Sequence, residues 1–204
     1  MAVSKLVPVD RLAAAVAAGL TTLGENRVQE LAEKHARLSG VAWHLVGHLQ
    51  ANKARRALEL AQVIESVDSC ELAERLDRLA AAAAGAAGRS GPARPVYLQV
   101  NVDADPAKAG FAPAALERDL ERLLELPALR VEGLMTVGRL VERPDDARPT
   151  FVGLHRLSDR LRRRDPRLGP GLSMGMSDDF EVAVEEGATL VRVGRAIFGE
   201  RPPA

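Results

Sequence analysis

Four lysines are the residues of this sequence that could bond covalently to a carbonyl compound. They stand among 28 basic residues, and the others are arginines, which stay charged and form no imine. Lys5 closes a predicted strand, Lys34 lies in a polar helix, Lys53 begins a helix and Lys108 follows a strand in a loop. Lys5 is therefore the candidate for imine formation, and a solvated lysine at a strand end is the alternative.

A glycine-containing loop near the C-terminus has the features of a phosphate site. Gly175 and Ser177 precede Asp178, and Asp178 with Glu181 has the spacing of a capping box. This spacing predicts a helix N-terminus, whose free N–H groups and positive dipole end favour anions. Gly194 would let the backbone of a later strand approach the same oxygens. Two ordinary glycine turns with a helix cap are the alternative.

Arg192 lies in an otherwise apolar segment, where an unpaired charge would be very costly. Its guanidinium must therefore meet either a structural ion-pair partner or a ligand atom. His44 and His48 lack the H-E-x-x-H context of a zinc pair, and we interpret both as structural. The sequence predicts no metal site.

The elements that must position these residues are short apolar segments alternating with amphipathic ones. The predicted strands cover 2–5, 22–25, 42–47, 63–67, 96–101, 131–137, 172–175 and 190–193. Each is rich in Val, Ile or Leu, as in buried parallel strands. Leucines at helical spacing predict helices over 71–80 and 114–126.

This alternation predicts an α/β fold, a single-domain (β/α)8 TIM barrel over residues 1–204. An open doubly wound sheet is the alternative, but the G-x-G-x-x-G turn that usually opens it is absent. A barrel carries its active site at the carboxyl ends of the strands. Lys5 and the loops around Ser177 and Gly194 would meet there.

Composition limits the function classes. The 28 basic and 28 acidic residues give zero net charge, which argues against a general nucleic-acid binder. A run of arginines over 156–167 is interpreted as a solvated helix face. One cysteine, no signal peptide and no apolar run of about 20 residues indicate a cytoplasmic protein that contacts no membrane.

Six segments, in order along nearly the whole chain, carry a resemblance to a known family. They are A-V-S-K at 2–5, G-E-N-R-V-Q-E at 24–30, H-L-V-G-H-L-Q-A-N-K at 44–53, G-L-M-T at 133–136, S-M-G-M-S-D-D at 173–179 and V-R-V-G-R-A-I-F-G at 191–199. With these segments the sequence resembles the pyridoxal 5′-phosphate homeostasis proteins. The resemblance implies a barrel similar to the N-terminal domain of alanine racemase that binds pyridoxal phosphate (PLP).

The resemblance also implies roles for individual residues. Lys5 matches the lysine that forms the aldimine with PLP, and Asn26 matches a residue near the cofactor ring. Ser177 and the backbone of Gly194 and Arg195 match the phosphate cup, and Arg192 matches the arginine that faces the pyridine nitrogen.

Two features depart from the family pattern. The family usually has a helix and more of the first strand before A-V-S-K, so the start at Met1 implies a truncated or misassigned N-terminus. Arg195 stands where a small hydroxyl residue is usual. Its guanidinium would then replace that hydroxyl, or its side chain would point outward and leave only the backbone N–H.

The function implied is binding, buffering and delivery of PLP with little or no catalysis. A charged arginine at the pyridine nitrogen weakens PLP as an electron sink, and Tyr97, the one tyrosine, lies within a predicted strand. Apo forms of PLP-dependent enzymes are the candidate recipients, and we expect a monomer. One alternative is an amino-acid racemase-like PLP enzyme. The other is a barrel that has lost PLP and binds phosphate compounds or a protein.

Overall fold

The described residues form one parallel, curled sheet of seven strands. A computed structural model describes residues 1–86, 92–139 and 141–199, and neighbouring strands pair in the order in which they occur along the chain. The strands are β1 (Ala2–Val3), β2 (Thr22–Glu25), β3 (Ala42–Leu45), β4 (Val63–Val67), β5 (Arg94–Gln99), β6 (Leu129–Met135) and β7 (Gly171–Ser173). Because all seven strands run in the same direction, their carboxyl ends lie together at the same end of the sheet.

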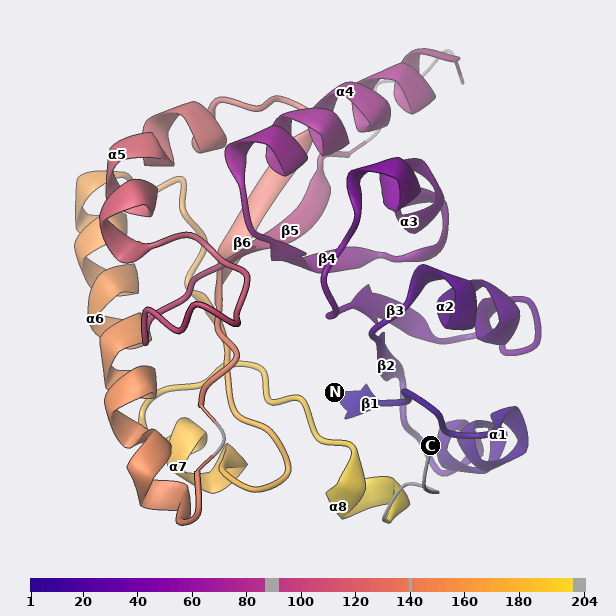
Figure 1. Cartoon of the computed structure of the whole chain (residues 1–204). Coiled ribbons are helices and arrows are strands. Elements are labelled where there is room, and N and C mark those ends of the chain that lie inside the picture. Colours follow the sequence, from indigo (N-terminus) through magenta and orange to yellow (C-terminus); the bar gives the residue numbers. More distant parts are fainter. Residues whose placement is uncertain (87–91, 140, 200–204) are drawn as a thin grey trace.

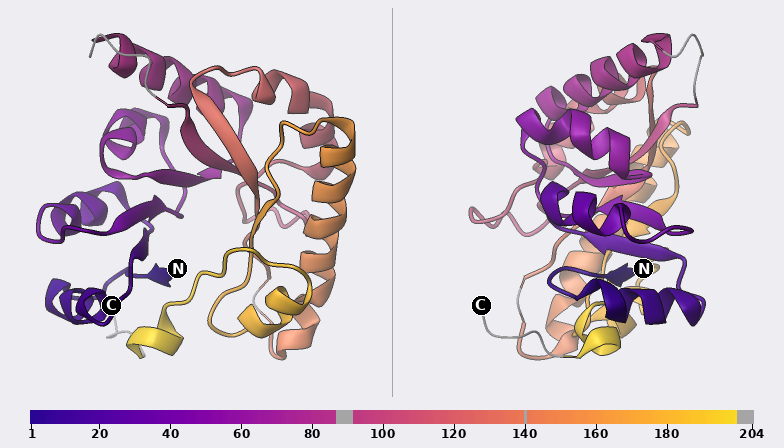
Figure 2. Two further views of the ribbon diagram at one scale, coloured as in Figure 1. Left: turned by 180° about the vertical axis from the view of Figure 1, so that it is seen from behind. Right: turned by 90° about the vertical axis from the view of Figure 1, so that its right-hand side faces the viewer.

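The helices lie outside the curled sheet, as Figures 1 and 2 show. They are α1 (Val9–Ala17), α2 (Val28–His35), α3 (Ala54–Leu60), α4 (Cys70–Ala86), α5 (Pro113–Leu124), α6 (Arg148–Arg164), α7 (Phe180–Glu185) and α8 (Arg195–Phe198), with 3-10 turns η1 (Ala51–Lys53) and η2 (Pro144–Ala147). Among the described residues, none of these helices has both the length and the apolar content to cross a membrane.

The apolar core lies between the sheet and the helices. α5 turns one face toward it, because Leu116, Leu120 and Leu123 are spaced at helical periodicity and are all buried. Trp43 of β3 is also fully buried. The inside of the curled sheet is more polar, and the buried Glu65 of β4 lies there. The sheet therefore separates an apolar outer layer from a polar interior.

The predicted elements correspond closely to the observed ones. β2 and β4 have the predicted bounds, whereas the other five strands end two residues before their predicted ends. Helices predicted at 71–80 and 114–126 are α4 and α5. The Ala-rich tract from residue 80 continues α4 to Ala86, and residues 87–91 lie outside the described part.

Residues 190–193, predicted as an eighth strand, do not form a regular strand. Leu190 makes a single parallel bridge to Ser173 of β7, and Val193 makes one to Ala2 of β1. Between them, the Arg192 N–H donates to the Gly175 carbonyl at 2.9 Å. The segment therefore touches both edges of the sheet through isolated residues, which are too few for a ladder.

Candidate functional site

The residues singled out from the sequence line one cavity of about 270 Å³. They are Lys5, Asn26, Ser177, Arg192, Gly194 and Arg195. The apolar part of its wall comes from Val3, Val46, Val137 and Met176. Residues from both ends of the chain therefore come together at one cavity.

The curled sheet explains this convergence. Lys5 follows β1, Asn26 follows β2 and Ser177 follows β7, so all three leave the carboxyl ends of parallel strands. Arg192 and Gly194 lie in the segment that bridges β7 and β1 before α8. In Figure 1 the chain that leads into α8 runs beside β1, the edge strand of the curled sheet.

Arg192 is buried and bonds to uncharged groups. Its Nη1 donates to Ser173 Oγ at 2.8 Å and its Nη2 donates to the Thr136 carbonyl at 2.6 Å. Ser173 Oγ in turn donates to the buried carboxylate of Glu65 at 2.5 Å. Burial lowers the pKa of Arg192, and the charges of Glu65 and Asp179 partly oppose this. A guanidinium has several donors, so Arg192 can also bond to a group in the cavity that it lines.

The loop after β7 is folded back on the segment before α8. Ser177 Oγ accepts hydrogen bonds from the N–H groups of Gly194 at 3.1 Å and Ala196 at 3.4 Å. Gly175 has a φ of +91°, and a Cβ there would lie 2.5 Å from the Cβ of Ala183. The turn that carries Ser177 to the cavity therefore requires glycine. A hydroxyl that accepts can also donate its proton, so Ser177 can bind an anion.

The capping box predicted at Asp178 and Glu181 is wrong. α7 begins two residues after Asp178, and no side chain caps it. Asp178 instead pairs with the Arg195 guanidinium at the rim of the cavity. The Asp179 carboxylate accepts from the Met176 N–H at 2.6 Å and holds the loop closed. Burial raises the pKa of Asp179, and the Met176 N–H and the Arg192 charge oppose that rise.

Asn26 is held where β2 and β3 end side by side. Its N–H donates to Glu25 Oε2 at 3.2 Å. A Cβ on Gly47 would lie 2.2 Å from the Asn26 carbonyl oxygen, so the close approach of the two chain segments requires glycine at Gly47. The geometry fixes the Asn26 backbone at the wall of the cavity.

Lys5 is half-buried, and the backbone on both of its sides is constrained. Ser4 is fully buried, and Leu6 has a φ of 62°, which L residues with a side chain rarely adopt. Lys34, expected in a polar helix, is buried in α2 and donates from Nζ to the Ser4 carbonyl at 2.7 Å. The i,i+4 spacing of Glu30 and Lys34 is the sequence signal that could have indicated that Lys34 is paired.

The two histidines bond to different carboxylates. His44 Nδ1 lies 2.5 Å from Glu65, and His48 Nδ1 lies 2.8 Å from Asp68. Within the described ranges, no group of three or more His, Cys, Asp or Glu side chains has an arrangement that could hold a metal ion.

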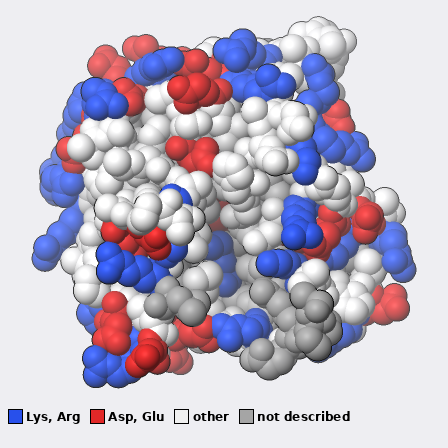
Figure 3. Space-filling model, in the orientation of Figure 1, with Lys and Arg blue, Asp and Glu red and all other residues white. Residues whose placement is uncertain are grey.

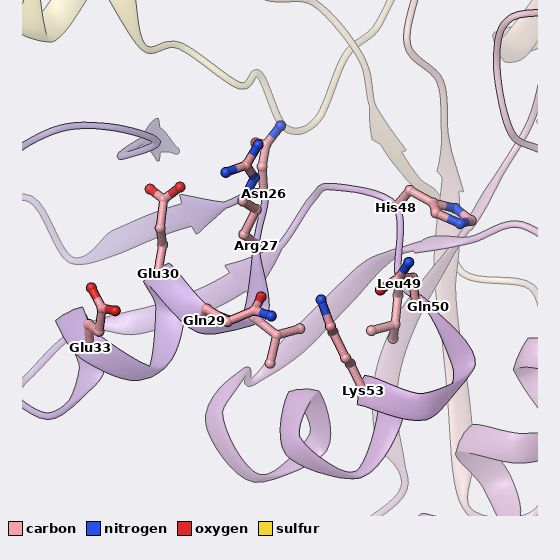
Figure 4. Close-up of a pocket in the computed structure, with 10 residues that line it drawn as sticks. Asn26, Arg27, Gln29, Glu30, Glu33, His48, Leu49, Gln50 and Lys53 are labelled. Atoms are coloured by element: carbon pink, nitrogen blue, oxygen red, sulfur yellow. The ribbon is translucent and has the colours of Figure 1, made fainter. Parts of the chain in front are cut away.

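A second cavity of about 490 Å³ adjoins the first at Asn26. Figure 4 shows it between the start of α2 and the η1 turn, with Glu30 on one side and Lys53 on the other. Its lining mixes both signs of charge, as does the surface in Figure 3, where basic and acidic side chains are interspersed. This second cavity was not expected from the sequence.

Comparison with known families matches nearly the whole chain. Residues 1–202 match the family described as alanine racemase, N-terminal domain. Proteins named pyridoxal phosphate homeostasis protein are similar to it in sequence. The one from Aquifex aeolicus is 40% identical over 97% of this chain and 85% of its own length, and the one from Escherichia coli K12 is 35% identical over 98% and 85%.

Solved structures show the same relationship. PipY of Synechococcus elongatus PCC7942, solved with PLP bound, is 41% identical, with a TM-score of 0.88 over 98% of this chain and 91% of PipY. Alanine racemase of Clostridium difficile 630 is only 14% identical, with a TM-score of 0.80 over 52% of the racemase chain, and shows the shared fold alone. The chain therefore belongs to the alanine racemase N-terminal domain family and, within it, to the pyridoxal phosphate homeostasis proteins.

Proposed function

We propose that this protein binds PLP in the cavity at Lys5 and serves PLP homeostasis by holding and delivering the cofactor, with little or no catalysis. The observation that carries the proposal is the convergence of Lys5, Asn26, Ser177, Arg192, Gly194 and Arg195 on one cavity. The PLP-bound structure of PipY, 41% identical to this chain, supports the choice of cofactor.

The chemistry of the cavity fits PLP. PLP carries an aldehyde, which condenses reversibly with a primary amine and releases one water. Lys5 supplies such an amine in a half-buried position. The Ser177 hydroxyl and the backbone around Gly194 and Arg195 offer donors for a phosphate, which would share the Gly194 N–H with Ser177 Oγ. Arg192 and Asn26 offer polar groups for the ring. The volume of about 270 Å³ suits one small ligand.

The surroundings of Arg192 and Tyr97 support a role without catalysis. The guanidinium of Arg192 is a donor, so a ring nitrogen bonded to it accepts and stays unprotonated, which weakens PLP as an electron sink. Burial raises the pKa of Tyr97 to about 12, and charges on Glu65 and Glu132 add to this. Tyr97 is therefore poorly suited to take a proton from an amino acid near neutral pH.

We propose further that the whole chain is one (β/α)8 barrel domain. The bridges from Leu190 to β7 and from Val193 to β1 support closure of the sheet by residues 190–193. The backbone bond from the Val3 N–H to the Val193 carbonyl, 2.8 Å long, supports the same pairing. Apo forms of PLP-dependent enzymes as recipients, a monomeric state and a cytoplasmic location complete the proposal.

Borohydride reduction of the PLP-loaded protein followed by peptide mapping tests the site. We expect the pyridoxyl group on Lys5 and its loss in Lys5→Ala, because Lys5 alone among the lysines lines the cavity within the described residues. Lys108→Ala is the matched control, since Lys108 bonds instead to the Gly138 carbonyl. Attachment to Lys34, Lys53 or Lys108 in the wild type would overturn the assignment.

A further inference from the structure

We propose that Lys34 is a positioning residue that sets the place and direction of the Lys5 amine through a buried polar cluster. This cluster, here the Lys34 clamp, consists of Ser4, Glu25, Glu30 and Lys34. The inference rests on the proposed function, because it concerns how the amine that receives PLP is held.

The Lys34 clamp forms hydrogen bonds to the backbone of both residues that flank Lys5. Lys34 Nζ donates to the carbonyl of Ser4, the residue before Lys5, at 2.7 Å. It also lies 3.4 Å from Glu30 Oε2, and the same carboxylate oxygen accepts from the N–H of Leu6, the residue after Lys5, at 3.1 Å. One ammonium group thus connects to the backbone before and after the candidate lysine.

The second arm of the clamp reaches Asn26. Lys34 Nζ donates to Glu25 Oε1 at 2.5 Å, and Ser4 Oγ donates to the same oxygen at 2.7 Å. The other oxygen of Glu25 accepts from the Asn26 N–H at 3.2 Å. The clamp therefore fixes the backbones at Lys5 and Asn26, two residues of the cavity wall, relative to each other.

Burial and strain show that this arrangement is costly to build. Glu25 is fully buried and Lys34 is 7% exposed. Burial raises the pKa of Glu25, while the hydrogen bonds from Lys34 and Ser4 oppose the rise. Leu6 is held at a φ of 62°, a left-handed conformation that is strained in a residue with a side chain. Backbone strain of this kind persists only where the surroundings hold it, and here Glu30 does so.

The test compares binding of PLP with its attachment to Lys5. Lys34→Met keeps a linear stem but leaves the Glu25 carboxylate buried without its cation. The double variant Glu25→Gln with Lys34→Met removes both charges, so it is expected to fold with near wild-type thermal stability. We expect both to bind PLP, yet to form the borohydride-reducible attachment at least about tenfold more slowly, since a shift of about 1 Å can cost about 100-fold.

Lys53→Met is the matched control, because it makes the same side-chain change in η1, on the other side of the second cavity from Glu30 (Figure 4). It should attach PLP at the wild-type rate. If the charge-removing variants fail to fold, Glu30→Met carries the test, since it removes the acceptor of the Leu6 N–H and keeps the Lys34–Glu25 pair. Attachment at the wild-type rate in a folded clamp variant would overturn the proposal.

Hydrogen exchange gives a readout that needs no PLP. The Leu6 amide should exchange faster than in the wild type in Glu30→Met, which removes its acceptor, and in the double variant, where Lys34 no longer holds Glu30 in place. Unchanged exchange would also overturn the clamp. A wild type that takes no PLP on Lys5 would refute the proposed function, while the exchange result would still decide the clamp.

Discussion

At the scale of single residues, the charge of Arg195 is already engaged at the rim of the cavity. Its guanidinium pairs with Asp178, and the two side chains are 41% and 58% exposed. An exposed ion pair contributes about 0–1 kcal/mol. We therefore expect Arg195 to contribute to the binding of an anion in the cavity mainly through the backbone at the start of α8.

We predict that Arg195→Ala weakens PLP binding by less than about 1 kcal/mol, below the range of about 1.5–3 kcal/mol for a hydrogen bond to a charged group. Equilibrium titration of PLP into the apo protein measures this. Adding Asp178→Asn removes the carboxylate that Arg195→Ala leaves unpaired and should recover the small loss. A large loss in Arg195→Ala that Arg195→Thr does not share would show that a side-chain donor contacts the phosphate.

The sequence pointed to Lys5 by elimination but not to Lys34. Residue type and strand position are visible in a sequence, so Lys5 and Ser177 could be identified as members of a site. The role of Lys34 depends on which face of α2 meets the end of β1, and this contact is long-range. A buried lysine is unusual unless it is paired, so the sequence favoured a solvated side chain.

At the scale of elements, strand existence was predictable and strand ends were not. Alternating apolar and amphipathic segments located β1 to β7 because buried parallel strands have this composition. The predicted strands included Lys5 and Gly47 near their ends. The structure places both residues in loops that follow the carboxyl ends of β1 and β3. The eighth segment failed as a strand because only its first and last residues, Leu190 and Val193, form bridges, one to β7 and one to β1. Strand ends depend on which residues pair with a neighbouring strand, and composition does not reveal this pairing.

The turn after β7 gives a prediction at this scale. Gly175→Ala should destabilise the protein by about 1–3 kcal/mol, because its φ is +91° and the new Cβ would lie 2.5 Å from the Cβ of Ala183. Gly85→Ala is the control. Gly85 lies in α4 with nothing within 4 Å of a new Cβ, so alanine should stabilise by about 0.5–1 kcal/mol. Chemical denaturation of both variants measures the difference, and equal effects would show that the turn tolerates a side chain.

At the scale of the whole molecule, the polar interior of the sheet lies under the cavity. Arg192 connects to Glu65 through Ser173, and His44 bonds to the same carboxylate. Helices enclose the sheet from outside, so this layer is shielded on that side by the apolar core (Figure 2). The arrangement holds one orientation of Arg192, so we expect it to present a fixed cation, instead of a carboxylate, to a ring bound in the cavity.

The chain should therefore catalyse little or no exchange at the Cα of amino acids. Arg192 disfavours a protonated ring, and Tyr97, the one tyrosine in the sequence, has a pKa raised to about 12. Its ring also lies against Gly171, at the amino end of β7, whereas the cavity lies at the carboxyl ends of the strands. We expect the PLP-loaded protein to exchange the Cα hydrogen of alanine in heavy water at well below about 1 per second, a slow rate for an enzyme. Proton NMR measures the exchange, with Lys5→Ala reporting the background from free PLP. Exchange above that rate in the wild type, absent from Lys5→Ala, would show that the cavity is an active site.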